Sequence, residues 1–460
     1  MKRTFSPNTN TDENLTDSSI RPFKTNYVRM KTKINVRFSN LSRITVQLLI
    51  VLFWSSSLMA SGRAGNVRDT LSYEQYRGYV VEKDSRKPLG FATLTLEGTN
   101  LSTVTNSDGE FSFKVPLLKT DGNVVVSFLG HKDKIIKLSE LKPDKNRIEL
   151  ELLSVTLGTI NIHPTDPAML MRTILSRRAE NYNQDQNRMT VFYRETTKKN
   201  KTYVSLSEAV LDVFKQPCLS GRIDQIELYK GRKSTDYTRL DTLTFKLQGG
   251  PYTSLLLDIM KNPEMVFTDD MVGKYQFDIE NITKIGDKLM YVIDFKQYPH
   301  IKEPLYYGKL YVDTESLAVE SAMFSLNVTD KMASSELFIR KKPVGAKVYP
   351  TEANYQVNYR EKDGRWIFGY SRAEIVFKVE WKRRLFNTHY ASTIEMAVTD
   401  WEKSQVKNAK PVDRLKTNVV MMDEVSGFSD PEFWGEYNVI EPERSIDQAI
   451  KKIQRKLKRN

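Results

Sequence analysis

The stretch that decides the fold is residues 77–116, RGYVVEKDSRKPLGFATLTLEGTNLSTVTNSDGEFSFKVP, followed at residues 124–132 by VVVSFLGHK. Side chains alternate in character from Phe91 to Leu96, which is the period-two pattern of a β-strand. The Asn-Ser-Asp-Gly sequence at 106–109 offers a tight reversal, because glycine adopts positive φ at no steric cost. Alternation resumes at Phe111, and Pro116 ends that strand because proline cannot donate to the ladder. This part of the chain is therefore predicted to be built from short strands and tight turns.

Four elements follow one another in this block: P-L-G-F-A at 88–92, G-T-N at 98–100, N-S-D-G-E-F at 106–111 and F-L-G-H at 128–131. In this order they resemble the carboxypeptidase-regulatory-like, or transthyretin-like, β-sandwich that is common in envelope proteins of Bacteroidota. The resemblance covers residues 76–153. It implies an accessory, Ig-like β-sandwich that carries no catalytic groups of its own.

The positive charge of the chain is concentrated at its ends. The net charge is +13, of which residues 1–43 contribute +6 and residues 451–460 another +6. The body between them is nearly neutral, so it has no general field that would attract a phosphate backbone. Nucleic acid is therefore excluded as a principal partner.

The single cysteine, Cys218, excludes an internal disulfide and any CxxC metal site. Because no histidine lies near it in the sequence, a packed thiol is favoured over a nucleophile. No cysteine follows the apolar segment near the N-terminus, so a lipoprotein anchor is not expected.

An export signal is predicted near the N-terminus. Residues 44–60, ITVQLLIVLFWSSSLMA, follow basic residues and precede small ones, which is the layout of a secretory signal. The run is shorter than the ~20 apolar residues of a membrane-spanning helix. Met30 begins a normal basic region, so we expect translation to start there, with residues 1–64 as leader and signal. The alternative is a cytosolic leader with an uncleaved anchor. The predicted location is the periplasm or the periplasmic face of the outer membrane.

The remainder of the chain reads as a linker and a second, larger β domain. Residues 154–165 form the expected linker and residues 166–440 the expected antiparallel domain. Asp166 and Pro167 suit an N-cap and a first helical position, so a helix is predicted at 167–182. A second helix is predicted at 253–262. The expected strands are 189–195, 203–214, 289–295, 305–312, 317–328, 355–359, 366–370 and 375–381.

Several stretches of this region, among them MTVFYRET at 189–196 and SDPEFWGEYNVIEPERSI at 429–446, resemble the C-terminal part of Bacteroidota proteins that pair such a sandwich with a domain of unassigned function. The strand pair GKLYVDTESLAVESA at 308–322 also resembles the curved antiparallel sheet of lipoprotein-carrier proteins. The expected fold class is therefore mainly β: a transthyretin-like sandwich followed by a curved antiparallel sheet with a few helices.

Residues 445–459 are predicted to form a basic amphipathic helix. Ser445 and Gln448 make a capping box, and apolar residues from Ile446 to Leu457 make a stripe. The first interpretation is a docking helix with a solvated basic face. The alternative is peripheral contact with a membrane, where each cation near an anionic leaflet contributes roughly 1 kcal/mol.

One constellation is compatible with zinc chemistry. A metallocarboxypeptidase needs a His and a Glu three residues apart and a distant His. His300 and Glu303 have this spacing, and His389 follows later. His163 and Asp166 repeat the spacing by accident. Pro299 and Pro304 bracket the first motif, which indicates a loop between strands, and no α/β pattern surrounds it.

Other motifs favour structural roles. The sequence holds no G-x-S-x-G elbow, P-loop or dinucleotide fingerprint, and the Gly-rich GGPYTSL at 249–255 lacks the lysine of a P-loop. Glu208 lies on an apolar strand face, where pairing with Arg194 is favoured over a role in a groove. Aromatic alternation at 355–370 is typical either of a ligand groove or of an ordinary sheet core.

Three hypotheses follow for the function. The preferred one is a non-enzymatic periplasmic protein that holds a hydrophobic or lipid ligand or docks an envelope protein, with no cofactor and no catalytic, cofactor-binding or metal residues. The second is an envelope zinc hydrolase using His300, Glu303 and His389. The third is a structural accessory of an outer-membrane transport system; the receptor itself is not expected, because the chain ends in a basic helix and not in an aromatic strand.

Overall fold

The computed structural model describes residues 73–153, 166–235, 250–285, 288–339, 345–382, 386–403, 408–426, 433–443, 446, 448, 450 and 451. The predicted leader 1–64 with its start at Met30, the linker 154–165 and most of the C-terminal helix 445–459 lie outside these residues. Within the described ranges, no helix is both long enough and apolar enough to cross a membrane.

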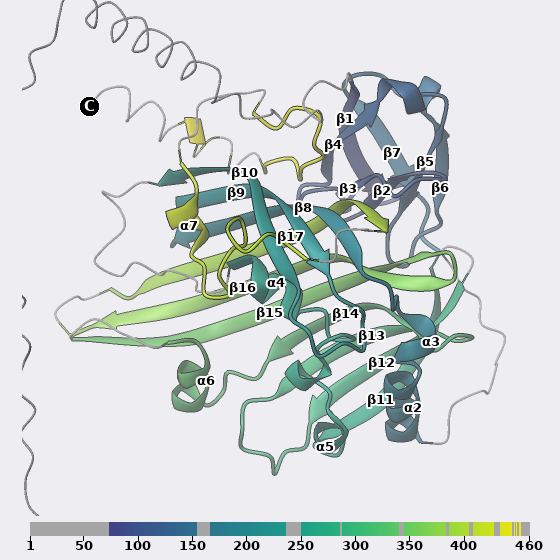
Figure 1. The fold of residues 1–460 in the computed structure, drawn as a ribbon. Helices are drawn as coiled ribbons and strands as arrows, with labels where there is room; N and C mark the ends of the chain where they lie inside the picture. Colours follow the sequence, from purple (N-terminus) through teal and green to yellow (C-terminus); the bar gives the residue numbers. More distant parts are fainter. Residues whose placement is uncertain are drawn as a thin grey trace, which may run out of the picture. The chain divides into compact units, whose positions relative to one another are not determined.

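The first described domain is a small β-sandwich (Figure 1). Its strands are β1 (Tyr73–Glu82), β2 (Thr93–Leu96), β3 (Ser102–Val104), β4 (Glu110–Pro116), β5 (Asn123–Ser127), β6 (Lys134–Lys137) and β7 (Asn146–Leu150), with short 3₁₀ turns η2 (Leu117–Lys119) and η3 (Leu138–Glu140). One sheet has the order β4-β1-β7 and the other β3-β2-β5-β6. Alternate residues of both sheets, such as Leu94 and Phe113, are fully buried between them.

The reversal predicted at 106–109 joins β3 to β4. The side-chain oxygen of Asn106 accepts hydrogen bonds from the backbone N–H groups of Asp108 (3.0 Å) and Glu110 (2.9 Å). Gly109 has φ +75°, and a Cβ there would lie 2.7 Å from the carbonyl oxygen of Val80. Glycine is therefore required at this turn both by its backbone conformation and by the approach of β1.

We expect Gly109→Ala to destabilise the protein by about 2–4 kcal/mol, because left-handed backbone alone costs roughly 1–2 kcal/mol and the contact with β1 adds to it. Gly98→Ala is the matched control, because Gly98 has φ +71° and nothing lies within 4 Å of its Cβ position. Urea unfolding of both variants measures the difference. An equal decrease in the free energy of unfolding of the two variants would contradict a role for the contact with Val80.

The second domain is built on one antiparallel sheet of ten strands (Figure 1). These strands are β8 (Asn187–Lys199), β9 (Thr202–Lys215), β10 (Gln225–Thr235), β11 (Tyr275–Ile285), β12 (Lys288–Gln297), β13 (Tyr306–Asp313), β14 (Val319–Leu326), β15 (Ala346–Lys362), β16 (Arg365–Trp381) and β17 (Thr388–Lys403). Their order is β10-β9-β8-β17-β16-β15-β14-β13-β12-β11. The chain thus runs outward from β8 to one edge, crosses to the other edge at β11, and meanders back until β17 pairs with β8.

Short helices accompany this sheet. They are α2 (Pro167–Ser176), α3 (Arg178–Asn181), α4 (Gly250–Leu256), α5 (Asp269–Val272), α6 (Lys331–Phe338) and α7 (Met421–Glu424), with the 3₁₀ turn η4 (Pro263–Met265). The main core lies on one face of the sheet, where α4 packs against β16 and β17 and α2 packs against the edge strand β11. The expected fold class, mainly β with a sandwich and a large antiparallel sheet plus a few helices, is confirmed.

The opposite face of the sheet carries the sandwich. Ser102 of β3 donates a hydrogen bond to the carbonyl oxygen of Val398 (3.1 Å), and Asn100 donates one to that of Trp401 (2.7 Å). A separate apolar cluster includes Val104 of the sandwich and Phe192 of β8 together with residues 434–440. Because Phe192 alternates with Val191, which belongs to the main core, the sandwich and the C-terminal segment lie on the face away from the helices.

Several predicted element boundaries are wrong. The helix expected at 167–182 is interrupted at Arg177, which has φ −80° and ψ 4°. The helix expected at 253–262 begins at Gly250 and ends at Leu256, since Pro251 favours the first turn. The strands expected at 366–370 and 375–381 are one strand, β16, which pairs along its length with β15. The first strand of the sandwich, β1, extends three residues before the predicted start at residue 76, and its Tyr73 pairs with Pro116.

Candidate functional site

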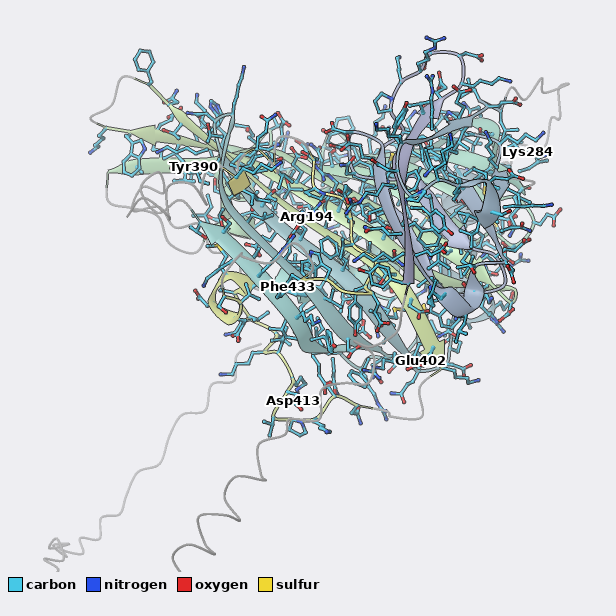
Figure 2. All side chains as sticks on the ribbon, turned by 90° about the horizontal axis from the view of Figure 1, so that it is seen from above. Arg194, Lys284, Tyr390, Glu402, Asp413 and Phe433 are labelled. Carbon is cyan, nitrogen blue, oxygen red and sulfur yellow. The ribbon has the colours of Figure 1, made fainter. Side chains whose placement is uncertain are left out.

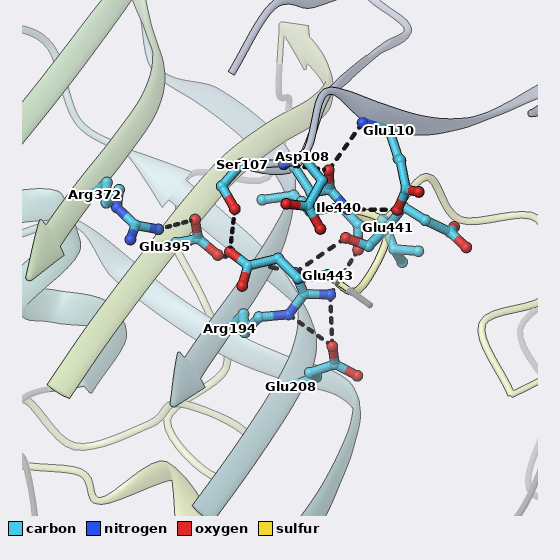
Figure 3. Close-up of polar contacts among 12 residues, drawn as sticks. Ser107, Asp108, Glu110, Arg194, Glu208, Arg372, Glu395, Ile440, Glu441 and Glu443 are labelled. Carbon is cyan, nitrogen blue, oxygen red and sulfur yellow. Dashed lines mark hydrogen bonds and ion pairs between the residues drawn. The ribbon is translucent and has the colours of Figure 1, made fainter. Parts of the chain in front are cut away.

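Arg194 lies at the centre of a buried ion network on the sandwich side of the sheet. Its guanidinium lies 2.7 Å from the carboxylate of Glu208 and 3.9 Å from that of Glu395, and it donates a 2.6 Å hydrogen bond to the carbonyl oxygen of Ile440. Arg232 contacts the second oxygen of Glu208 at 2.8 Å. The pairing predicted between Glu208 and Arg194 is therefore confirmed (Figure 3).

The same network connects the sheet, the sandwich and the C-terminal segment (Figure 3). Glu443 accepts hydrogen bonds from Ser107 of the sandwich turn (2.6 Å) and from Tyr203 of β9 (2.9 Å). Asn438 exchanges hydrogen bonds with the backbone of Lys114 at 2.7 and 3.0 Å. Figure 2 shows Arg194 among the side chains over the sheet. Because its charged groups are buried and paired with one another, we interpret this network as structural.

The C-terminal helix contacts the same region. Ile446 and Ile450 are buried against Tyr203 and Leu206 of β9, as the docking interpretation expects. The basic half of the helix, residues 452–460, lies outside the described residues, so contact with a membrane stays a prediction.

The three residues of the zinc hypothesis are not brought together. His300 is exposed in the loop after β12, and Glu303 forms a 2.7 Å ion pair with Lys274. His389 is exposed on β17. Five strand spacings, roughly 24 Å, separate β17 from β12. Across the described part of the chain, no group of three His, Cys, Asp or Glu side chains is placed to hold a metal.

The other candidate residues have structural environments. Asp166 caps α2, accepting from the backbone N–H of Ala168 (2.9 Å) and Met169 (3.1 Å), whereas His163 lies outside the described residues. Cys218 is buried, and burial together with the nearby charge of Asp258 raises the pKa of its thiol to about 12. A thiol with this pKa is protonated at neutral pH, which agrees with the packed role expected for it.

The aromatic residues of β15 and β16 between 355 and 370 are buried in core clusters, and Tyr359, Trp366 and Tyr370 also line a cavity. Tyr355, Tyr359, Trp366 and Phe368 all belong to the main core under the helices. Their polar neighbours in sequence, such as Gln356, point to the opposite face, because side chains alternate along a strand.

A pocket of about 520 Å³ opens beside α4, at the side of the main core. It is lined by the loop between β9 and β10, by α4 and by the turns that follow α4. Three of its lining residues, Leu219, Ile223 and Leu256, are large, apolar and more than half exposed. Exposed apolar side chains gathered at one opening are typical of a binding surface.

The wall of this pocket carries an excess of positive charge. Arg178, Arg222 and Lys261 line it, against the carboxylates of Asp224 and Glu264. Arg178 is held in place by hydrogen bonds to the carbonyl oxygens of Leu175 and Met260, both 2.9 Å. The residues that line the pocket therefore suit an apolar ligand with an anionic group.

Two of the lining residues, Asp224 and Lys261, belong to a buried network of paired charges that extends beyond the pocket lining. The ammonium of Lys215 lies 2.8 Å from Asp224 and 2.7 Å from Asp258, and that of Lys261 lies 2.6 Å from Asp224. Tyr359 donates a 3.0 Å hydrogen bond to Asp258. Burial alone would raise the pKa of Asp224, but Lys215 and Lys261 lower it below its usual range. The charges of Lys261 and Asp224 cancel each other, so the positive excess of the wall comes from Arg178 and Arg222 against Glu264.

Sequence reasoning did not identify this pocket. Its residues come from segments far apart in the chain, and their only local signal is a turn-rich loop, QPCLSGRID at 216–224, that carries Leu219 and Ile223 between small and polar residues. Apolar side chains in such a loop have no strand or helix face to bury them.

Comparison with known structures gives distant likenesses. The chain is similar to a DUF1329 family protein from Desulfovibrio piger (13% identity, 53% of this chain and 96% of that chain, TM-score 0.21) and to a putative outer membrane lipoprotein-sorting protein domain from Vibrio parahaemolyticus (10%, 54% and 95%, 0.23). It is also similar to lipovitellin (8% identity, 49% of this chain and 26% of that chain, TM-score 0.25). At these TM-scores the likenesses carry no argument about this protein.

No curated protein matches the sequence. Residues 76–159 match the family model of the CarboxypepD_reg-like domain, over the region that folds as the sandwich. The match agrees with the resemblance seen in the sequence of this region. The chain therefore contains a CarboxypepD_reg-like domain at residues 76–159.

Proposed function

We propose that this chain is a non-enzymatic binding protein of the Bacteroidota cell envelope, which holds an acyl chain with an anionic head in the pocket beside α4. The observation that carries the proposal is the combination of an apolar opening with a positively charged wall around a volume of about 520 Å³. That volume falls in the range of small-molecule sites, which are mostly apolar with a few polar groups that orient the ligand.

Different residues of the pocket contact the acyl chain and the anionic head of the ligand. Leu219, Ile223 and Leu256 contact the acyl chain, whose transfer from water is the main source of affinity. Arg178 and Arg222 hold the anionic head, because guanidinium groups form charge-assisted hydrogen bonds with carboxylate and phosphate. Export to the envelope is supported by the signal-like segment at 44–60.

We expect purified full-length protein to bind palmitic acid, with Ile223→Asp weakening the binding about tenfold or more. A charge at the opening opposes burial of the acyl chain, and 1.4 kcal/mol of lost burial corresponds to a factor of ten. The matched control is Ile135→Asp in the sandwich, because Ile135 is 62% exposed and Ile223 is 67% exposed. Native mass spectrometry and calorimetry measure the binding.

A second comparison tests the anionic head. Hexadecanol carries the same chain length without the charge, so we expect it to bind more weakly than palmitic acid and to be insensitive to Arg222→Glu. Equal binding by the Ile223→Asp and Ile135→Asp variants would contradict the proposed site. Stoichiometric zinc in the purified protein would contradict a non-enzymatic role.

A further inference from the structure

A second cavity lies between the sandwich and the large sheet and shares no lining residue with the pocket beside α4. Its volume is about 510 Å³. The sandwich contributes residues of β2 and β5 and their loops, and the sheet contributes residues of β14, β15 and β16 from its sandwich-facing side. We call this cavity the interdomain cleft. Domain interfaces are common places for ligand sites.

The walls of the interdomain cleft offer hydroxyl and amide groups from both domains. These are Thr93, Thr95 and Ser127 of the sandwich and Ser321, Gln356 and Asn358 of the sheet. Asn358 accepts hydrogen bonds from Ser321 (3.0 Å) and Gln356 (3.2 Å), which fixes the orientation of both amides. Among the described residues, the Nδ2 of Asn358 and the Oε1 of Gln356 have no side-chain partner, so a donor and an acceptor remain for a ligand.

Glu320 places a carboxyl group on the cleft without an ion-pair partner within the described ranges. Burial raises the pKa of this carboxyl to about 8, with Lys288 acting in the opposite direction and Asp133 adding to the rise. The group is therefore mostly protonated at neutral pH, so it both donates and accepts hydrogen bonds.

Arg360 closes the floor of the cleft. Its guanidinium donates to the hydroxyl of Ser102 in β3 and to the carbonyl oxygen of Val398 (3.0 Å), which ties the sandwich to β17. Its Nε is buried and has no hydrogen-bond partner among the described residues. Burial lowers the pKa of Arg360 to about 10, so the group stays charged at neutral pH.

Phe91 lines the cleft in a strained backbone conformation. Its φ is +69°, which is rare for a bulky side chain and persists only where the surroundings fix it. Its ring stacks on that of Tyr370, with centroids 5.6 Å apart, and the Cζ of Arg372 lies 5.3 Å from its centroid. The fold therefore holds an aromatic surface at the cleft at a conformational cost.

The charges around the cleft nearly balance. The cations are Lys288, Arg360 and Lys362, and the acids are Glu97, Asp133 and Glu361, besides the protonated Glu320. Lys288 already pairs with Glu361 and lies 3.5 Å from Asp313. A strongly charged ligand therefore has no net electrostatic attraction to the cleft. A neutral ligand with many hydroxyl groups can form hydrogen bonds with the hydroxyl, amide and carboxyl groups of both walls.

We propose that the interdomain cleft is a second binding site, which takes a neutral saccharide. The hydroxyl groups of the sugar hydrogen-bond to Gln356, Asn358 and Glu320, and its apolar ring face packs on Phe91. The site is independent of the acyl-chain pocket, because it shares no lining residue with it. It makes the CarboxypepD_reg-like domain one half of a binding site and not only an accessory.

The test uses the full chain on an array of immobilised neutral and acidic oligosaccharides, followed by calorimetry with the best neutral probe. We expect neutral saccharides to be retained and Glu320→Ala to weaken binding about tenfold or more, since a site built to bind hydroxyl groups discriminates strongly. Glu315→Ala, at an exposed position in the turn before β14, is the matched control and should bind like the parent.

A second variant tests the same site independently, in case Glu320→Ala does not fold well. Gln356→Ala removes an amide from a partly exposed position on β15, and we expect it to weaken binding several-fold while palmitic acid binding is retained. Retention of acidic glycans alone, or of no glycan, would overturn the proposal. Neutral saccharide binding that survives both variants unchanged would place the site elsewhere and overturn it as well.

Discussion

Replacing Glu208 with Leu lowers the free energy of unfolding by about 3–5 kcal/mol, the largest single effect we expect in this protein. Glu208 is 1% exposed and its carboxylate is shared by Arg194, which is 2% exposed, and Arg232, which is 12% exposed. Without the carboxylate, the buried cation of Arg194 keeps only partial compensation from Glu395, which lies 3.9 Å away, and Arg232 loses one of its partners. An uncompensated buried charge costs far more than the ion pair contributes on its own.

The C-terminal segment should loosen in the same variant. Arg194 binds the carbonyl oxygen of Ile440 at 2.6 Å, and Arg232 lies 4.7 Å from the ring centre of Trp434. Both arginines therefore hold residues 433–443 against β8, β9 and β10. We expect faster hydrogen exchange and proteolysis in this segment before the sheet itself unfolds.

The control for this prediction is Glu149→Leu. Glu149 pairs with Arg147 at 2.9 Å, but both side chains are 38% exposed, so the loss should stay below about 0.5 kcal/mol. Adding Arg194→Met to Glu208→Leu removes the uncompensated cation of Arg194 and should recover part of the stability. A double variant no more stable than Glu208→Leu alone would contradict the explanation by unpaired charge.

Local patterns predicted most of the strands, because each strand has its own signal. The hairpin turn at Asp363 and Gly364 and the reversal at 106–109 lie where their sequences place them. The alternation of side chains along the strand also predicted the ion pair of Glu208. Its carboxylate lies on the apolar face of the strand, where a buried charge requires a cation beside it. These inferences depend only on neighbours along one strand or across one hairpin.

Features that depend on distant segments were missed or misread. The pocket beside α4 joins the β9–β10 loop to residues around 255–264, and the interdomain cleft joins β2 to β15. The sequence also grouped His300 with His389 by type and spacing, although the sheet order places their strands far apart. Hydrophobic periodicity does not determine the order of strands after a crossover, so the sequence alone does not predict sites that are assembled by that order.

The helix α6 was not predicted for another reason. Asp330 is a good N-cap, but the segment after it has almost no buried face.

Replacing Glu320 with Gln raises the stability of the protein at alkaline pH and leaves it unchanged in acid. Burial raises the pKa of Glu320 from 4.5 to about 8 in the folded protein. The folded state therefore binds a proton that the unfolded state releases between these values. Stability contributed by the protonated carboxyl is complete below about pH 4.5 and is lost as the pH rises through about 8.

The expected size follows from the difference between the two pKa values. Each unit of difference corresponds to 1.36 kcal/mol, so ionising Glu320 costs about 2–5 kcal/mol once partial exposure to the cleft is allowed for. Glutamine has the same shape and does not titrate, so Glu320→Gln should exceed the parent by this amount near pH 9. Urea unfolding of both proteins across the pH range measures the difference between them.

The comparison with the parent is needed because another buried carboxyl titrates in the same range. Burial raises the pKa of Glu195 to about 7, against the hydrogen bond from Tyr193, so Glu320 is not the only carboxyl whose ionisation lowers the stability of the parent as the pH rises. In Glu320→Gln, only the loss of stability that is caused by ionisation of Glu320 disappears. The control Glu315→Gln should show the same dependence of stability on pH as the parent. Parallel curves for Glu320→Gln and the parent would show that the carboxyl is ionised without cost, and the cleft would then favour a cationic ligand over the neutral saccharide proposed above.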